Sequence, residues 1–171
     1  MSALEGIVLR AARPEDADAI EVLTLVSYFD VPGSTHREHQ AIDALRADGA
    51  LSLSWVAEHD GYVVAHLAAS PVELSDGGRG WHVLGPLAVG PGHRGHGLAG
   101  DLLRAALAQL RQDGAAGCVV ASPPRALFLA AGFAPEPGLT LDGAPLLAHG
   151  FGDRLPPLAE ASLHPALTGM G

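Results

Sequence analysis

The segment with the clearest chemistry is a glycine-rich loop between an apolar strand and a helix. Its glycines stand at Gly90, Gly92, Gly95 and Gly97, and Arg94 lies among them. Glycines let the backbone turn sharply and approach a ligand closely, while a helix N-terminus offers unpaired N–H groups and the positive end of its dipole. The spacing therefore predicts a cradle for a phosphate or pyrophosphate group, with Arg94 adding a positive charge.

Two common phosphate-binding motifs fit this loop poorly. Residues 95–100 formally spell Gly-x-Gly-x-x-Gly, but five residues separate the strand end at Val89 from Gly95. A dinucleotide site also needs an acid at the end of the next strand, where Ala121 and Ser122 stand instead. No Gly-Lys-Ser/Thr follows, which excludes a P-loop. A nicotinamide oxidoreductase is therefore only a third interpretation.

The elements that position this loop predict an α+β fold. The strands 51–58, 62–74 and 81–89 would form an antiparallel meander, and leucines from Leu98 to Leu110 form one apolar helix face. The order β-α-α-β-β-β-α-β-α-β-β indicates a mixed, mostly antiparallel central sheet flanked by helices. We expect strands over 7–10, 51–58, 62–74, 81–89, 117–122, 139–141 and 145–151, and helices over about 13–25, 35–47, 98–113 and 124–131.

The composition limits the range of partners and compartments. The 171 residues, 48% of them hydrophobic, fit a single domain over 1–152 with a C-terminal tail over 153–171 packed on it. A net charge of −9 argues against nucleic acid and against an anionic membrane surface. The single cysteine, Cys118, sits in an apolar run and suits a buried core position. With no apolar stretch of membrane-spanning length and no signal-like N-terminus, we expect a cytoplasmic protein.

The nine histidines do not form a convincing metal site. His36 and His39, like His93 and His96, stand three residues apart, but the second pair falls in the glycine loop. Neither pair has cysteines or a cluster of aspartates nearby in the sequence. We therefore expect no metal.

Three segments resemble the GNAT N-acetyltransferase superfamily. Residues 94–99, Arg-Gly-His-Gly-Leu-Ala, are similar to its Arg/Gln-x-x-Gly-x-Gly/Ala motif. Residues 85–89, Gly-Pro-Leu-Ala-Val, resemble the strand whose bulge grips the pantetheine arm, in a bacterial branch of predicted acetyltransferases. Residues 128–133, Phe-Leu-Ala-Ala-Gly-Phe, resemble the aromatic-x-x-x-Gly-Phe ending of that domain. The resemblance runs from about Ile7 to Phe151.

The resemblance implies an acetyl-CoA-dependent N-acetyltransferase. Its acceptor would be a primary amine of a small molecule or a peptide, which attacks the thioester directly, and a homodimer is compatible with the family. Backbone groups of the cofactor strand would pair with the pantetheine amides and polarise the thioester carbonyl. The cofactor-binding residues expected by resemblance are Leu87, Ala88, Val89, Arg94, Gly95, His96, Gly97, Leu98, Ala99 and Phe128.

One position departs from the family pattern. Many members carry a tyrosine where this chain has Phe128, and that tyrosine protonates the leaving thiolate. Phenylalanine cannot donate a proton, although a thiol with a pKa near 8.5 already leaves fairly well at neutral pH. Ser122 or a water could substitute. The departure keeps a second hypothesis open, a catalytically weak acyl-CoA-binding module that senses or regulates.

Several titratable side chains are candidates for the general base that takes a proton from the amine. Glu58, at a strand end, and His82, beside the cofactor strand, are the catalytic candidates, although each also suits a purely structural position. Glu38 and His39 lie on the second expected helix, which lines the substrate side in this fold.

Overall fold

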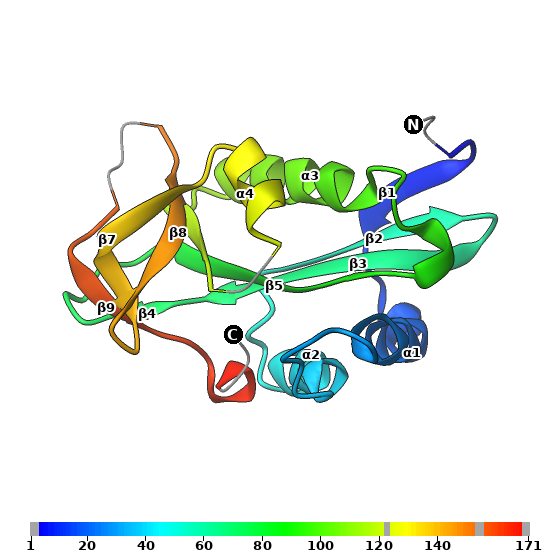
Figure 1. Cartoon of the computed structure of the whole chain (residues 1–171), viewed down its shortest axis with the longest axis horizontal. Coiled ribbons are helices and arrows are strands. Elements are labelled where there is room, and N and C mark those ends of the chain that lie inside the picture. The colour runs from blue at the N-terminus through cyan, green and yellow to red at the C-terminus, as the bar shows by residue number, and fades with distance from the viewer. Residues whose placement is uncertain (1–3, 122–123, 153–155, 169–171) are drawn as a thin grey trace.

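The computed structural model describes residues 4–121, 124–152 and 156–168, and these build one nine-stranded sheet with helices on both faces (Figure 1). In spatial order the sheet runs β1-β2-β3-β5-β6-β8-β7-β9-β4. Its strands are β1 (Ile7–Ala11), β2 (Leu53–His59), β3 (Tyr62–Pro71), β4 (Glu73–Leu74), β5 (Trp81–Val89), β6 (Gly117–Val120), β7 (Ala134–Leu141), β8 (Ala144–Gly150) and β9 (Ala159–Ser162). The α+β class expected from the sequence is confirmed.

Two helical layers cover the sheet. Figure 1 shows α3 and α4 on one face and α1 and α2 on the other. The helices are α1 (Ala17–Tyr28), α2 (Glu38–Ala47), α3 (Leu98–Gln112) and α4 (Arg125–Ala130), with short 3-10 turns η1 (Pro14–Asp16), η2 (Pro91–His93) and η3 (Pro165–Leu167). The apolar face of α3 is buried on the sheet, where Leu102 and Leu103 join a core that Phe128 and Phe133 extend.

The expected antiparallel meander is present as β2, β3 and β5, with β1 added at its edge. Asp60 and Gly61 connect β2 to β3 with φ angles of 51° and 83°. Positive φ at both central residues is the hairpin turn that Asp-Gly favours, because its twist matches that of the flanking strands.

The expected strand over 62–74 is interrupted. After β3 ends at Pro71, the two residues of β4 leave the meander and pair with β9, Glu73 lying opposite Ser162. β9 comes from the segment expected as a surface tail, and it also pairs in parallel with β7. The C-terminal segment thus contributes a strand to the sheet.

The second helix begins later than expected. The sequence suggested a start near Thr35, but α2 begins at Glu38. His36 has a φ of 60°, which no helical residue adopts, so residues 34–37 form a turn before the helix. The Glu38 carboxylate accepts the N–H of Thr35 and thereby stabilises this turn.

Candidate functional site

The site begins where two neighbouring strands separate. β5 runs parallel to β6, but the two strands pair only over Trp81–Val83 and Gly117–Val119. Beyond Val83, this edge of β5 no longer pairs with β6. Because backbone N–H and C=O groups need partners, this edge is suited to bind an extended ligand.

A bulge marks the point of separation. Leu84 lies opposite Ala69 and Leu87 lies opposite Leu67, so Gly85 and Pro86 together face the single residue between those two in β3. The two-against-one count defines a β-bulge, which redirects the backbone of the bulged strand. The bulge implied by the family resemblance is therefore present in this strand.

The backbone beyond the bulge alternates between two directions. Gly90 donates its N–H to Val64 O of β3 at 2.8 Å, so strand periodicity directs Ala88 to β3 as well. Leu87 and Val89 then present their N–H groups on the opposite, open edge. Of the three residues expected to pair with a pantetheine arm, Leu87 and Val89 direct their N–H groups to the open edge, and Ala88 directs its N–H to β3.

Two hydroxyls at the end of α1 occupy this open edge. Leu87 donates its N–H to the Tyr28 hydroxyl at 3.2 Å, and Val89 donates its N–H to Ser27 Oγ at 3.2 Å. The Ser27 hydroxyl in turn donates to Val89 O at 3.1 Å. Sequence reasoning missed both residues, although Tyr28 is one of only two tyrosines in the chain.

A cradle of about 480 Å³ lies at the far end of the same edge. The first hydrogen bond within α3 runs from Asp101 N–H to Gly97 O at 3.0 Å, so the N–H groups of Leu98, Ala99 and Gly100 precede the helical ladder. These groups and the positive end of the helix dipole point into the anion site predicted from the sequence. The remaining lining residues are Val89, His93, Arg94, Gly95, His96, Gly97, Asp101, Arg104 and Leu127.

Glycine is required at the turn into α3. Gly97 has a φ of 82° and caps the helix in the left-handed region, where a side chain would be strained. No heavy atom lies within 4 Å of the place where a Cβ would stand on Gly97, so the space over the helix start is open.

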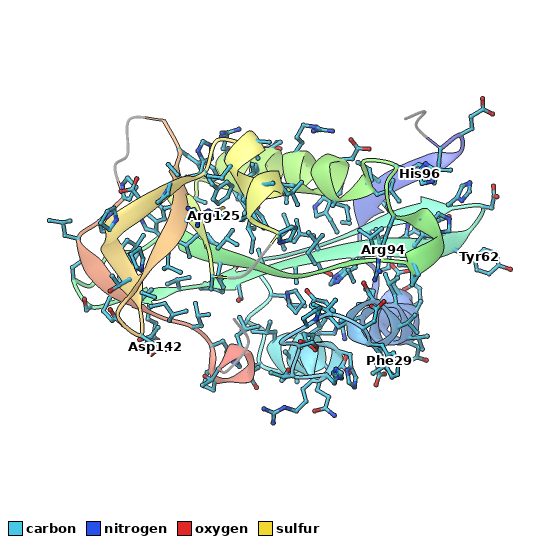
Figure 2. The ribbon with its side chains drawn as sticks, in the orientation of Figure 1. Phe29, Tyr62, Arg94, His96, Arg125 and Asp142 are labelled. Atoms are coloured by element: carbon cyan, nitrogen blue, oxygen red, sulfur yellow. The ribbon has the colours of Figure 1, made fainter. Side chains whose placement is uncertain are left out.

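Arg94 lines the cradle but binds the protein more closely than we expected. Its guanidinium donates to Ser27 O at 2.8 Å and to Val89 O at 3.3 Å. These bonds fasten the end of α1 to the end of β5, and the positive charge of Arg94 stays on the wall of the cradle, where its expected contact with a pyrophosphate remains a prediction. Figure 2 shows Arg94 on the α1 side of this loop and His96 on the α3 side.

A second cation stands on the rim of the cradle. Arg104, on the second turn of α3, pairs with Asp101 and keeps most of its side chain exposed. Its place on the cradle could not be predicted from the sequence, because it depends on which face of α3 covers the sheet.

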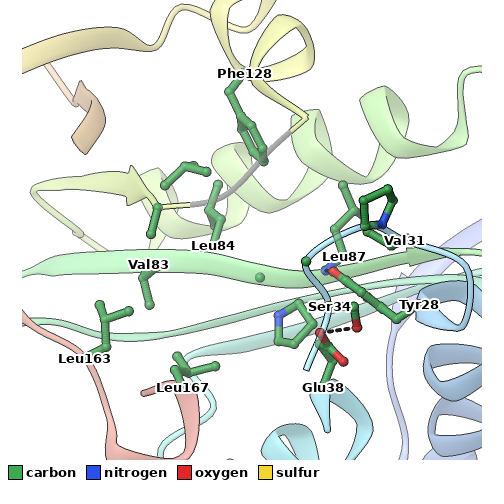
Figure 3. Close-up of a pocket in the computed structure, with 16 residues that line it drawn as sticks. Tyr28, Val31, Ser34, Glu38, Val83, Leu84, Leu87, Phe128, Leu163 and Leu167 are labelled. Atoms are coloured by element: carbon green, nitrogen blue, oxygen red, sulfur yellow. Dashed lines mark hydrogen bonds between the residues drawn. The ribbon is translucent and has the colours of Figure 1, made fainter. Parts of the chain in front are cut away.

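A pocket of about 120 Å³ lies at the near end of the edge, beside the bulge. Its walls are mostly apolar and come from β5, α4, the loop after α1 and the C-terminal segment (Figure 3). Three side chains bring oxygen atoms to it, namely Tyr28, Ser34 and Glu38. The other lining residues are Val31, Pro32, Gly33, Val83, Leu84, Gly85, Pro86, Leu87, Val120, Ala121, Phe128, Leu163 and Leu167.

Glu38 is a buried carboxylate in this pocket, 6% exposed. Its Oε1 accepts the Ser34 hydroxyl at 2.7 Å and the Thr35 N–H at 3.1 Å. Its Oε2 is buried and has no hydrogen-bond partner among the described residues. Burial raises the pKa of Tyr28, and the nearby charge of Glu38 raises it further.

Phe128 is a residue of α4, and it lines the opposite side of the pocket from Glu38. It is buried, and its ring meets that of Phe133 edge to face with 5.5 Å between centroids. The Phe128 ring is part of the core and carries no proton donor. The pocket therefore has a phenyl ring where the family pattern has a tyrosine.

The two expected base candidates do not line this pocket. Glu58 accepts a hydrogen bond from Arg10 Nε at 2.8 Å, and Arg10 also pairs with Asp16 at 2.7 Å. His82 Nδ1 lies 2.7 Å from Ser52 Oγ, and burial lowers its pKa. Both side chains thus make hydrogen bonds within the protein, away from this pocket. The third candidate, Ser122, lies outside the described residues.

Other chemistries find little support in the described part of the chain. Burial raises the pKa of the Cys118 thiol to about 12, so it does not serve as a nucleophile at neutral pH. Residues 4–121, 124–152 and 156–168 hold no group of three side chains suited to a metal ion. None of the helices in these ranges has the length and apolar character needed to cross a membrane.

Comparison with known proteins agrees with this geometry. The model of the acetyltransferase (GNAT) family matches residues 18–133. The uncharacterized N-acetyltransferase YhbS of Escherichia coli K12 is 34% identical over 128 residues, which cover 74% of this chain and 73% of YhbS.

Two solved structures are similar over nearly the whole chain. A GNAT family acetyltransferase from Brucella melitensis in complex with acetyl-CoA has 36% sequence identity and a TM-score of 0.83, covering 94% of this chain and 97% of its own. E. coli YhbS in complex with CoA has 27% identity and a TM-score of 0.85, covering 100% and 97%.

Proposed function

The chain belongs to the acetyltransferase (GNAT) family, and from this premise we propose that it transfers an acetyl group from acetyl-CoA to a primary amine. The observation that carries the proposal is the open edge of β5. This edge starts at an apolar pocket and ends at an anion cradle, with the N–H groups of Leu87 and Val89 between them.

The residues along this edge fit acetyl-CoA. The backbone N–H groups at the start of α3 would hold the pyrophosphate, where Gly97 keeps the space above the helix clear. Val89 would pair with the pantetheine arm, and Leu87 with the thioester at its end, once Ser27 and Tyr28 give up these N–H groups. The relatives solved with acetyl-CoA and with CoA support the same assignment.

The chemistry needs a thioester and a donor at its carbonyl oxygen. Acetyl-CoA supplies the thioester, whose C–S bond breaks as the amine nitrogen bonds to the carbonyl carbon. Leu87 N–H is the backbone donor at the bulge, and the Tyr28 hydroxyl beside it has a proton to donate. Because burial raises the pKa of Tyr28, its hydroxyl stays protonated at neutral pH.

We assign Tyr28 a hydrogen bond to the carbonyl oxygen, because its hydroxyl lies beside the Leu87 N–H. With its raised pKa the hydroxyl keeps its proton at neutral pH and donates it in that hydrogen bond. Negative charge on the carbonyl oxygen is what a neutral hydroxyl stabilises best. Phe128 forms an apolar wall, and the thiolate leaves without a proton from that side.

Transfer is tested with the purified chain, acetyl-CoA and a panel of primary amines. Free thiol release that depends on the amine, together with an amine heavier by one acetyl group, is the expected result. Binding of acetyl-CoA without release to any amine would contradict the transferase and favour an acyl-CoA-binding module.

A further inference from the structure

We infer that Glu38 recognises the acceptor, and that this acceptor is a small primary amine with a single positive charge and an apolar substituent. The inference rests on the proposed function and names the substrate class for it. It comes from three properties of the pocket beside the bulge, namely its carboxylate, its charge and its size.

The two oxygens of the Glu38 carboxylate differ in their hydrogen bonds within the described part of the chain. Oε1 is fixed by Ser34 and Thr35, while Oε2 is buried without a partner among the described residues. A buried carboxylate oxygen that lacks a partner is costly, and an ammonium group can relieve that cost. The site therefore favours a cationic group beside the Glu38 carboxylate.

The position of Glu38 suits a nucleophile near the bulge. Its charge raises the pKa of Tyr28, whose hydroxyl accepts the Leu87 N–H. An amine beside Glu38 thus lies in the same pocket as the two donors assigned to the thioester carbonyl (Figure 3). The fraction of the amine that is neutral carries the lone pair for attack, and Glu38 holds the amine beside the thioester.

The rest of the pocket excludes further charges on the acceptor. The described residues that line it include no lysine, arginine or histidine. The carboxylate of an amino acid would have no counter-charge there and would be repelled by Glu38. A second ammonium group, as in a polyamine, would lie against Val83, Leu163 and Leu167 at a desolvation cost.

The C-terminal segment limits the size of the acceptor. Leu163 and Leu167 close one side of the pocket, and His164 Nε2 lies 2.9 Å from Asp48 Oδ2 at the end of α2. The His164 Nδ1 also accepts the Ala166 N–H at 3.0 Å, which holds this wall in place. A cavity of about 150 Å³ accommodates benzene, so a pocket of about 120 Å³ encloses a short alkyl group and at most part of a benzyl group.

The first test measures amine binding without turnover. Benzylamine is titrated calorimetrically into the chain saturated with CoA, using the wild type, Glu38→Gln and Glu21→Gln. In Glu38→Gln the amide oxygen of the new side chain can keep the bonds from Ser34 and Thr35, so the turn before α2 survives. Glu21 is an exposed carboxylate on α1 and serves as the matched control.

We expect Glu38→Gln to weaken benzylamine binding about 30-fold or more, while Glu21→Gln changes nothing. Benzyl alcohol, which has the same shape without the charge, should bind weakly to all three proteins. Equal benzylamine affinity for wild type and Glu38→Gln would overturn the inference. So would equal binding of benzyl alcohol and benzylamine.

The second test measures specificity with acetyl-CoA present. The values of kcat/KM should be higher for butylamine and benzylamine than for glycine, spermidine or a tripeptide. Leu167→Ala should extend acceptance to 4-phenylbutylamine by enlarging the pocket. A preference for the tripeptide or for spermidine would contradict the assigned class.

The two proposals fail in different ways. If benzylamine binding requires Glu38 but no amine is acetylated, the pocket assignment stands and the transferase fails. If amines are acetylated equally well by wild type and Glu38→Gln, the transferase stands and the role of Glu38 is wrong.

Discussion

The hydroxyl of Tyr28 accepts a hydrogen bond from the backbone N–H of Leu87 at 3.2 Å. The contact joins the last residue of α1 to the first residue after the bulge of β5. It places a side-chain hydroxyl on the opposite side of the pocket from Phe128 (Figure 3). The pocket beside the bulge thus has a tyrosine hydroxyl, although this tyrosine is not at the sequence position of the family pattern.

Tyr28→Phe should lower kcat about 100-fold, because one donor to the carbonyl oxygen is lost. The KM for acetyl-CoA should change little, since the N–H of Leu87 remains. Tyr62→Phe is the matched control, because Tyr62 is 75% exposed at the start of β3. Steady-state rates of thiol release measure both variants. An unchanged kcat in Tyr28→Phe would remove this tyrosine from the chemistry.

Ala99→Glu should weaken acetyl-CoA binding about 30-fold or more. Ala99 is the second residue of α3 and lines the cradle, so a carboxylate there repels a pyrophosphate. The fold should survive, because an acidic residue in the first turn of a helix is stabilising by about 0.3–1 kcal/mol. Calorimetric titration gives the affinity and a thermal melt reports the fold.

Ala99→Gln separates charge from bulk in this experiment. The glutamine side chain has nearly the same size as glutamate but no charge, so its affinity should stay well above that of Ala99→Glu. Equal affinities in the two variants would show that crowding alone explains the loss, and the anion site would then lie elsewhere.

His66 should make the protein sensitive to acid. The side chain is fully buried in β3, its Nε2 lies 2.7 Å from Ser54 Oγ, and burial lowers its pKa to about 3. The unfolded chain takes up this proton near pH 6.5, so protons favour unfolding between these two values. The stabilising effect of high pH is therefore lost as the pH falls below 6.5.

The contribution of His66 to the free energy of unfolding should fall by about 1.4 kcal/mol for each pH unit below 6.5. Urea unfolding at pH 7 and pH 5 measures this change in the wild type and in His66→Gln. The variant keeps a polar group near Ser54 but does not titrate, so its loss should be about 2 kcal/mol smaller. Parallel losses in the two proteins would assign the acid sensitivity to other groups.

The local features of the fold could be predicted from the sequence because neighbouring residues determine them. The Asp60–Gly61 turn follows from two residues that tolerate positive φ. The leucines of α3 repeat at helical spacing, and they are buried in the core. By contrast, β4 and β9 are too short to show a pattern, and their pairing joins Glu73 to Ser162, which are about half of the chain apart in sequence.

The candidate site also has a part that could be predicted from the sequence and a part that could not. The cradle could be predicted because it is made of backbone N–H groups, which glycines and a helix start provide locally. The hydroxyls of Ser27 and Tyr28 could not, because their place on β5 depends on how the end of α1 packs across the sheet. Glu38 was a candidate beside His39, and only the packing of α2 shows that Glu38 is the more buried.

A crystal structure of the chain with acetyl-CoA tests the central claim most directly. The claim is that transfer takes place on the open edge of β5, between the cradle and the pocket. We expect the pyrophosphate on the N–H groups at the start of α3 and the thioester carbonyl oxygen within hydrogen-bond distance of Leu87 N–H. A pyrophosphate bound away from α3, or a thioester outside the pocket that holds Tyr28 and Glu38, would contradict the account.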